Sequence, residues 1–141
     1  MVLDLKCLID WRKSMVIIYF SLTGQTRKFV DKLNMDVLEL NPADPFVEIN
    51  EPFIIVTPAY DKEVTEILND FLETGSNIEW FKGVAGGGNI NFGKLFAFTA
   101  KDIARDYNVP LLHTFEFQGN QADVSKLKKA VNNIGINRYN E

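Results

Sequence analysis

Two uninterrupted runs of uncharged, mostly apolar residues constrain the fold of this chain most strongly. They cover residues 15–20 and 53–57, and nearly all of their side chains are β-branched or aromatic. A strand with one solvent-facing side alternates apolar and polar residues, whereas a strand buried on both faces is apolar throughout. Helices that connect parallel strands cover both faces of a sheet. The two runs therefore predict a parallel sheet between two layers of helices.

The rest of the chain alternates between strand patterns and helix patterns. Further strands are expected at residues 36–40, 81–85 and 109–117, and helices at 27–34, 64–74, 94–107 and 123–134, the last N-capped by Asp123. Five alternating strands fit a flavodoxin-like, doubly wound α/β fold with strand order 2-1-3-4-5. Residues 15–141 are expected to form one domain, and residues 1–14 an N-terminal extension without an assigned role.

Composition and charge exclude several classes of function. One Cys and one His rule out a disulfide framework and a Cys/His zinc site, and no metal site is expected. Residues 36–79 hold eleven acidic residues against one basic residue, Lys62, which does not suit a nucleic-acid backbone. The uncharged stretch 15–25 is too short to span a membrane, and the extension lacks a secretory apolar segment. We therefore expect a cytoplasmic protein without a nucleic-acid or membrane partner.

The predicted topology brings three loops to one crevice. In doubly wound sheets the ligand binds outside the carboxyl ends of the strands, where the strand order reverses. Here the reversal falls between the first and third strands. The loops at residues 21–26, 58–63 and 86–93 are expected to surround it.

The first loop has the chemistry of a phosphate site. Ser21, Thr23 and Thr26 supply hydroxyl groups, Gly24 allows close approach of the backbone, and a helix N-terminus follows. The loop contains no Walker lysine and only one glycine, so it is neither a P-loop nor a dinucleotide fingerprint. The alternative is an ordinary strand-to-helix turn capped by Thr26.

The second and third loops offer contacts to a flat ring. Pro58 ends the third strand, and Tyr60 can lie across a ring at low entropic cost, although a surface tyrosine in a turn is the alternative. The run of glycines at 86–88 is expected to form a loop with accessible N–H groups. Asn89 offers a donor and an acceptor, and Phe92 can cover part of the ring. The lone His113 is expected to be structural.

Several of these segments resemble motifs of the NrdI family. They are Tyr19-Phe-Ser-Leu-Thr-Gly-Gln-Thr26, Thr57-Pro-Ala-Tyr60, Gly88-Asn-Ile-Asn-Phe-Gly93, and Phe115-Glu-Phe-Gln-Gly119 with Asp123-Val124. The family comprises flavodoxin-like FMN proteins that serve class Ib ribonucleotide reductases. Gly-Asn-x-Asn-Phe-Gly is the most specific of these motifs, and the resemblance runs from Met15 to about Ile134.

The resemblance implies FMN as the cofactor and assigns a role to each loop. Ser21, Thr23, Gly24, Gln25 and Thr26 would bind the phosphate. Pro58, Ala59, Tyr60 and Asp61 would line one side of the isoalloxazine, and Gly87, Gly88, Asn89, Phe92 and Gly93 its other edge. In the family, reduced flavin reacts with dioxygen, and the superoxide passes to the reductase small subunit. There it oxidises a dimanganese centre and a tyrosyl radical forms, so the protein would be an activating partner rather than a turnover enzyme, supplied by an unidentified electron donor.

The chain departs from the family pattern at two places. Ile90 stands where the family commonly has Arg, and Tyr60 is followed by Asp61 rather than by glycines. Two other functions therefore stay open beside the activating role. One is a general electron-transfer flavodoxin, which would lack the Gly88–Gly93 motif. The other is a flavodoxin-like interaction module without flavin, which would not be yellow when purified.

Overall fold

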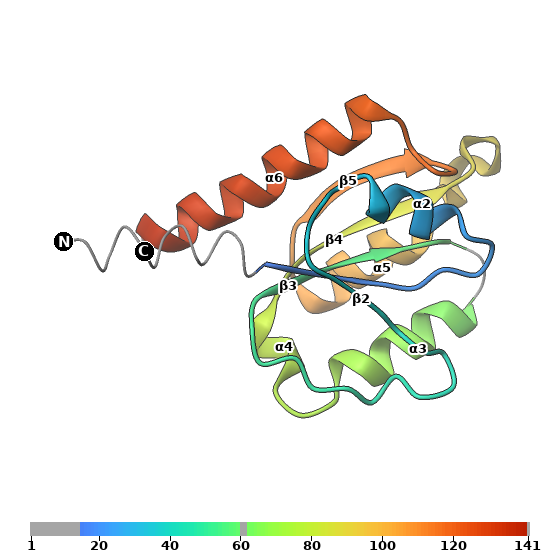
Figure 1. The fold of residues 1–141 in the computed structure, drawn as a ribbon. Coiled ribbons are helices and arrows are strands. Elements are labelled where there is room, and N and C mark those ends of the chain that lie inside the picture. The colour runs from blue at the N-terminus through green and yellow to red at the C-terminus, as the bar shows by residue number, and fades with distance from the viewer. Residues whose placement is uncertain (1–14, 60–61, 141) are drawn as a thin grey trace.

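A five-stranded parallel sheet forms the centre of the computed structural model, which describes residues 15–59 and 62–140 (Figure 1). The strand order is β2-β1-β3-β4-β5, and every pairing is parallel. The strands are β1 (Val16–Tyr19), β2 (Val37–Glu39), β3 (Phe53–Thr57), β4 (Phe81–Gly88) and β5 (Leu111–Glu116). The fold class and the strand order predicted from the sequence are confirmed.

Helices cover both faces of the sheet (Figure 1). They are α2 (Gln25–Asp31), α3 (Lys62–Leu72), α4 (Asn77–Trp80), α5 (Phe98–Tyr107) and α6 (Gln121–Asn140), with a 3-10 segment η1 (Ile90–Leu95). Side chains of α2 and α6 pack in one hydrophobic cluster, and those of α3 and α5 pack in another on the opposite face. No helix within the described residues is long and apolar enough to cross a membrane.

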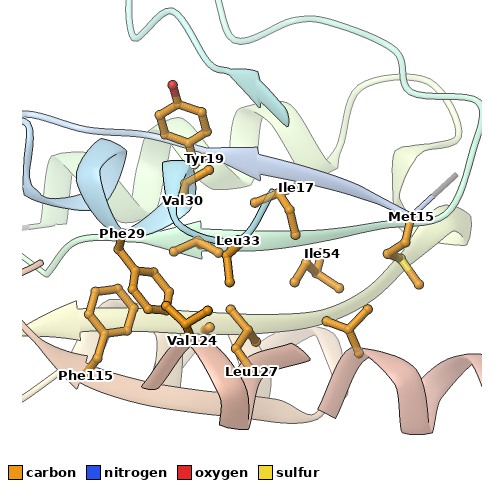
Figure 2. Packing of buried hydrophobic residues seen from close by; sticks show 13 residues of the cluster. Met15, Ile17, Tyr19, Phe29, Val30, Leu33, Ile54, Phe115, Val124 and Leu127 are labelled. Carbon is orange, nitrogen blue, oxygen red and sulfur yellow. The ribbon is translucent and has the colours of Figure 1, made fainter. Parts of the chain in front are cut away.

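Each central strand contributes to both hydrophobic clusters. Ile17 and Ile54 belong to the cluster with α2 and α6, whereas their neighbours Ile18 and Ile55 belong to the cluster with α3 and α5. Successive side chains of a strand point to opposite faces, so burial of both faces requires an uninterrupted apolar run. Figure 2 shows the first cluster, in which Phe29 of α2 stacks on the ring of Phe115 from β5 with centroids 3.9 Å apart.

The glycines at 86–88 belong to strand β4, so the expectation that they form a loop was wrong. They pair with Thr114, Phe115 and Glu116 of β5. A Cβ at Gly86 would lie 2.4 Å from the Cβ of Ala100, and one at Gly87 would lie 2.8 Å from the Phe115 ring. Glycine is therefore required here because α5 and a neighbouring side chain pack directly on the strand.

The predicted helix over residues 94–107 begins later, at Phe98. The residue before it, Ala97, has a left-handed backbone (φ 53°), which breaks the helix and separates η1 from α5. Ala97 is fully buried, and its backbone nitrogen would lie 3.0 Å from a Cβ at Gly88. Close contact with β4 thus accompanies the break.

The last helix begins at Gln121 rather than at Asp123. The Asn120 side chain accepts a hydrogen bond from the Asp123 backbone N–H, and the Asp123 carboxylate accepts one from the Asn120 N–H, both at 2.9 Å. This reciprocal pair is a capping box in which Asn120 is the N-cap and Asp123 is three residues inside the helix. The assignment of Asp123 as the N-cap was therefore wrong by three positions.

The short helix α4 and a buried asparagine were not predicted. Asn77, at the start of α4, is fully buried. Its Nδ2 donates to the carbonyl oxygens of Val47 and Phe71, and its Oδ1 accepts from the Ile49 N–H, each at 2.8 Å. These bonds tie the segment before β3 to the end of α3.

Candidate functional site

A cavity of about 340 Å³ lies at the carboxyl ends of the strands. Its lining comes from the ends of β1, β3, β4 and β5 and comprises Thr23, Gln25, Thr26, Pro58, Ala59, Gly87, Gly88, Asn89 and Phe117. All three loops expected around the crevice contribute to it. The structure therefore brings together residues as far apart in sequence as Thr23 and Phe117 at the point where the strand order reverses.

The loop after β1 is organised by Gly24 and Ser21. Gly24 is the N-cap of α2 and has φ 90°, a left-handed conformation that favours glycine. A Cβ there would meet nothing within 4 Å, so the requirement is conformational rather than steric. The Ser21 hydroxyl oxygen accepts hydrogen bonds from the N–H groups of Gly24 at 3.1 Å and Arg27 at 3.4 Å. Ser21, rather than Thr26, thus helps to cap the first turn.

Arg27, beside this loop, forms an ion pair with Glu39 on strand β2. The guanidinium donates two hydrogen bonds to the Glu39 carboxylate, at 3.1 and 2.6 Å, and the Tyr19 hydroxyl donates a third at 2.9 Å. The hydrogen bonds from Arg27 hold the pKa of Glu39 below its usual value. Because the described residues that line the cavity include neither Lys nor Arg, the polar groups facing it are hydroxyls, amides and backbone groups.

The loop after β4 is fixed by two local hydrogen bonds. The Asn89 Oδ1 accepts from the Asn91 N–H at 2.9 Å, and the Ile90 N–H donates to the Glu116 carboxylate at 3.1 Å. Gly93 has φ 58° and open space around its Cβ position. This arrangement leaves Gly87, Gly88 and Asn89 at the cavity and Ile90 exposed.

Not every residue expected at the site lies in the cavity lining. Ser21, Gly24 and Gly93 lie outside it, although the first two shape the loop that enters it. Tyr60 and Asp61 lie outside the described residues, as does the side chain of Phe92. Their predicted contacts to a ring stay predictions.

Phe117 lines the cavity and was not expected there. It follows β5 in a turn closed by the Gly119 N–H and the Glu116 carbonyl at 2.8 Å, and its φ is 52°. A left-handed backbone at a bulky residue costs about 1–3 kcal/mol and is typical of functional sites. The sequence signal was the Gln118-Gly119 turn placing an aromatic residue at the ligand end of β5.

A second cavity of about 560 Å³ is also bordered by this turn. Ile90, Glu116 and Phe117 belong to its lining, so the two cavities share Phe117. Within residues 15–59 and 62–140, no group of three or more His, Cys, Asp or Glu side chains could hold a metal ion.

His113 has a structural partner, as expected. Its Nε2 lies 2.7 Å from the Asp123 Oδ1, which joins β5 to the first turn of α6. Burial raises the pKa of Asp123, but the hydrogen bonds from His113 and from the Asn120 N–H outweigh it, and the pKa is lowered overall. This contact supports the turn that carries Phe117.

Each of three solved structures with the same fold is a flavodoxin. A flavodoxin from Streptococcus pneumoniae TIGR4 has a TM-score of 0.56 and 20% identity, covering 87% of this chain and 98% of its own. A short-chain flavodoxin associated with a PDU bacterial microcompartment has a TM-score of 0.59 and 17% identity, covering 90% and 98%. A flavodoxin from the domain Archaea has a TM-score of 0.55 and 12% identity, covering 90% and 99%. At these identities the likeness concerns the fold.

The family of this chain follows from a match to a family model. The family model described as NrdI flavodoxin-like matches residues 17–129, which include all of the sheet except Val16 and all of the described residues in the cavity lining. With the strand order and the loop motifs already in place, this match means that the chain belongs to the NrdI flavodoxin-like family.

Proposed function

We propose that this protein binds FMN in the cavity and, once reduced, activates the small subunit of a class Ib ribonucleotide reductase. The observation that carries the proposal is the coincidence of the NrdI family match with a cavity lined by Thr23, Thr26 and the Gly87–Asn89 segment. The bound flavin would supply reduced oxygen species from dioxygen, which the partner uses to oxidise its metal centre and form a tyrosyl radical.

The residues of the first loop fit a phosphate held by neutral donors. Gly24 has a left-handed backbone at the N-cap of α2, and Thr23 and Thr26, which carry hydroxyl groups, line the cavity. The positive charge of Arg27 is already engaged by Glu39. Hydrogen bonds to a charged group are about twice as strong as neutral ones, so hydroxyls and backbone N–H groups suffice for the dianion.

The residues around the cavity mouth fit a protein partner. Leu22, Ile90 and Phe117 come from three different loops at the ligand end of the sheet, and their side chains are 52%, 61% and 50% exposed. Exposed apolar side chains gathered at a site support protein docking. The apolar Ile90, in place of the family's common Arg, makes this face less basic than the family pattern implies.

The phosphate assignment is tested with a Thr23→Ala, Thr26→Ala double variant. Each hydrogen bond lost to the phosphate costs about 1.5–3 kcal/mol, so FMN affinity should fall steeply while riboflavin affinity changes little. The matched Thr23→Ser, Thr26→Ser variant keeps both hydroxyls and should bind FMN nearly as the wild type does. Equal FMN affinity of the alanine variant and the wild type would contradict this placement of the phosphate.

The activating role is tested by radical formation. The FMN-loaded protein is reduced and mixed with a manganese-loaded class Ib small subunit and dioxygen, and the tyrosyl radical is measured by electron paramagnetic resonance. Radical yield should follow the amount of reduced protein, and free reduced FMN is the control. A yield no higher than that of the control, together with tight FMN binding, would favour the electron-transfer alternative.

A further inference from the structure

We propose that the isoalloxazine ring packs against the side chain of Phe117. The turn that carries Phe117 is strained and is fixed by hydrogen bonds from other elements, and it positions this side chain. This inference rests on the proposed FMN site and deepens it. Phe117 is the aromatic residue among the described members of the cavity lining, the others being small, polar or proline. A flat conjugated ligand gains from stacking on such a ring.

The backbone of Phe117 is strained, and packing of its side chain in the hydrophobic core does not account for the strain. Its φ of 52° is unfavourable for a residue with a bulky side chain, yet the side chain is half exposed. Burial of apolar surface therefore does not compensate the strain fully. Strained residues at such positions cluster at ligand sites, where the conformation aims a side chain.

Several contacts brace the turn from different elements. The Phe117 N–H donates to the Gly88 carbonyl at 3.1 Å, which ties the turn to the cavity end of β4. Lys32 donates from its Nζ to the carbonyl oxygens of Gln118 and Gly119, at 3.2 and 3.1 Å. A Cβ at Gly119 would lie 2.5 Å from the Phe29 ring, so the turn also sits directly on the core.

The braced turn places Phe117 at both cavities. The residue belongs to the lining of the 340 Å³ cavity and of the neighbouring 560 Å³ cavity. An aromatic ring at this border would limit how far the flat ring of the flavin extends beyond Gly88 and Asn89.

The test compares Phe117→Ala with Phe46→Ala, since Phe46 is an exposed phenylalanine outside both cavity linings. Alanine keeps the Cβ and removes the ring, so dissociation constants for FMN should rise about 5- to 150-fold in Phe117→Ala, as for loss of one stacked base. Riboflavin should lose the same factor, because the ring is common to both ligands. A change below fivefold for FMN, or equal to that of Phe46→Ala, would overturn the inference.

A Phe117→Trp variant gives a second readout that does not depend on how well the alanine variant folds. An indole in van der Waals contact with a flavin ring quenches its fluorescence by electron donation far more than a phenyl ring does. The bound flavin should therefore emit less in Phe117→Trp than in the wild type, and equal emission would refute the contact. A wild-type protein that binds no FMN would instead count against the proposed function itself.

Discussion

Asn77 illustrates how a single polar side chain can hold two distant segments. It is fully buried and satisfies three backbone groups, those of Val47, Ile49 and Phe71. A buried backbone group that loses its partner costs about 1–3 kcal/mol. The role of this residue lies in its contacts, which the sequence does not indicate.

We expect Asn77→Ala to lower the free energy of unfolding by about 3 kcal/mol, because it leaves one buried and two partly buried backbone groups unpaired at once. Urea denaturation followed by circular dichroism measures the change. The exposed Asn50 provides the control, and Asn50→Ala should stay within about 0.5 kcal/mol of the wild type. Similar losses in the two variants would show that the buried bonds contribute little.

Asp123 makes the stability of the protein depend on pH. Its pKa is lowered in the folded chain, where hydrogen bonds from His113 and the Asn120 N–H outweigh the effect of burial. A depressed carboxyl pKa gives stability that is present above the unfolded value of about 3.9 and is lost as the pH falls through the folded value.

Acidification from neutral pH to below about 4 should therefore destabilise the wild type more than Asp123→Asn, which has no carboxyl to protonate. The free energy of unfolding is measured at several pH values for both proteins. Asp36→Asn, at an exposed position, is the control and should keep the wild-type dependence. Parallel curves for the wild type and Asp123→Asn would contradict this assignment.

Strand β4 and helix α5 are the elements whose contact shapes the cavity. A Cβ at Gly86 would lie only 2.4 Å from that of Ala100, so at this position the two elements meet through glycine and alanine. Farther along, Phe81 of β4 and Tyr107 of α5 meet through their rings. The close approach at Gly86 brings the following residues, Gly87 and Gly88, to the cavity. At Gly86 the distance between the two elements is set by a residue without a side chain and by one with a single methyl group.

Gly86→Ala should destabilise the protein by about 1–3 kcal/mol through overpacking. Adding Ala100→Gly removes the opposing methyl group and should restore part of the loss, although a glycine inside a helix costs about 1 kcal/mol by itself. Urea denaturation of both single variants and the double variant measures the coupling. Strictly additive losses would mean that the two residues do not meet.

Strands β3 and β4 and the start of α5 show which parts of the fold could be predicted from the sequence. Strand β3 was predicted to the residue, because its apolar run ends at a proline. Strand β4 was predicted too short, since glycines are typical of loops and only the packing of Ala100 and Phe115 explains them. The break at Ala97 gave no signal, because alanine favours helices.

The sequence also predicted where the cavity lies, but not every residue that lines it. The alternating pattern of strands and helices fixes where loops meet, and that placed Thr23, Pro58 and Asn89 at one edge of the sheet. It does not fix the dihedral angles within a turn. Phe117 was therefore missed, since its position depends on a left-handed backbone and on contacts from Lys32.

At the scale of the whole molecule, ligand binding should raise the melting temperature of the protein. A ligand at 100 times its dissociation constant stabilises the folded state by about 2.7 kcal/mol, which for a domain of this size corresponds to a rise of roughly 10 °C in the melting temperature. FMN should give this rise, and riboflavin at the same concentration a smaller one because it lacks the phosphate. Equal rises measured by scanning calorimetry would mean that the first loop contributes nothing.

The order of the elements along the chain sets the order in which the cavity walls leave the ribosome. Because β1 lies between β2 and β3, synthesis up to residue 57 supplies three adjacent strands of the five-stranded sheet, and β4 and β5 then add outward one at a time. Residues 23–26 emerge first and Phe117 last. A nascent chain thus carries the proposed phosphate loop long before the proposed ring wall, and the cavity lining is complete only after β5 has been synthesised.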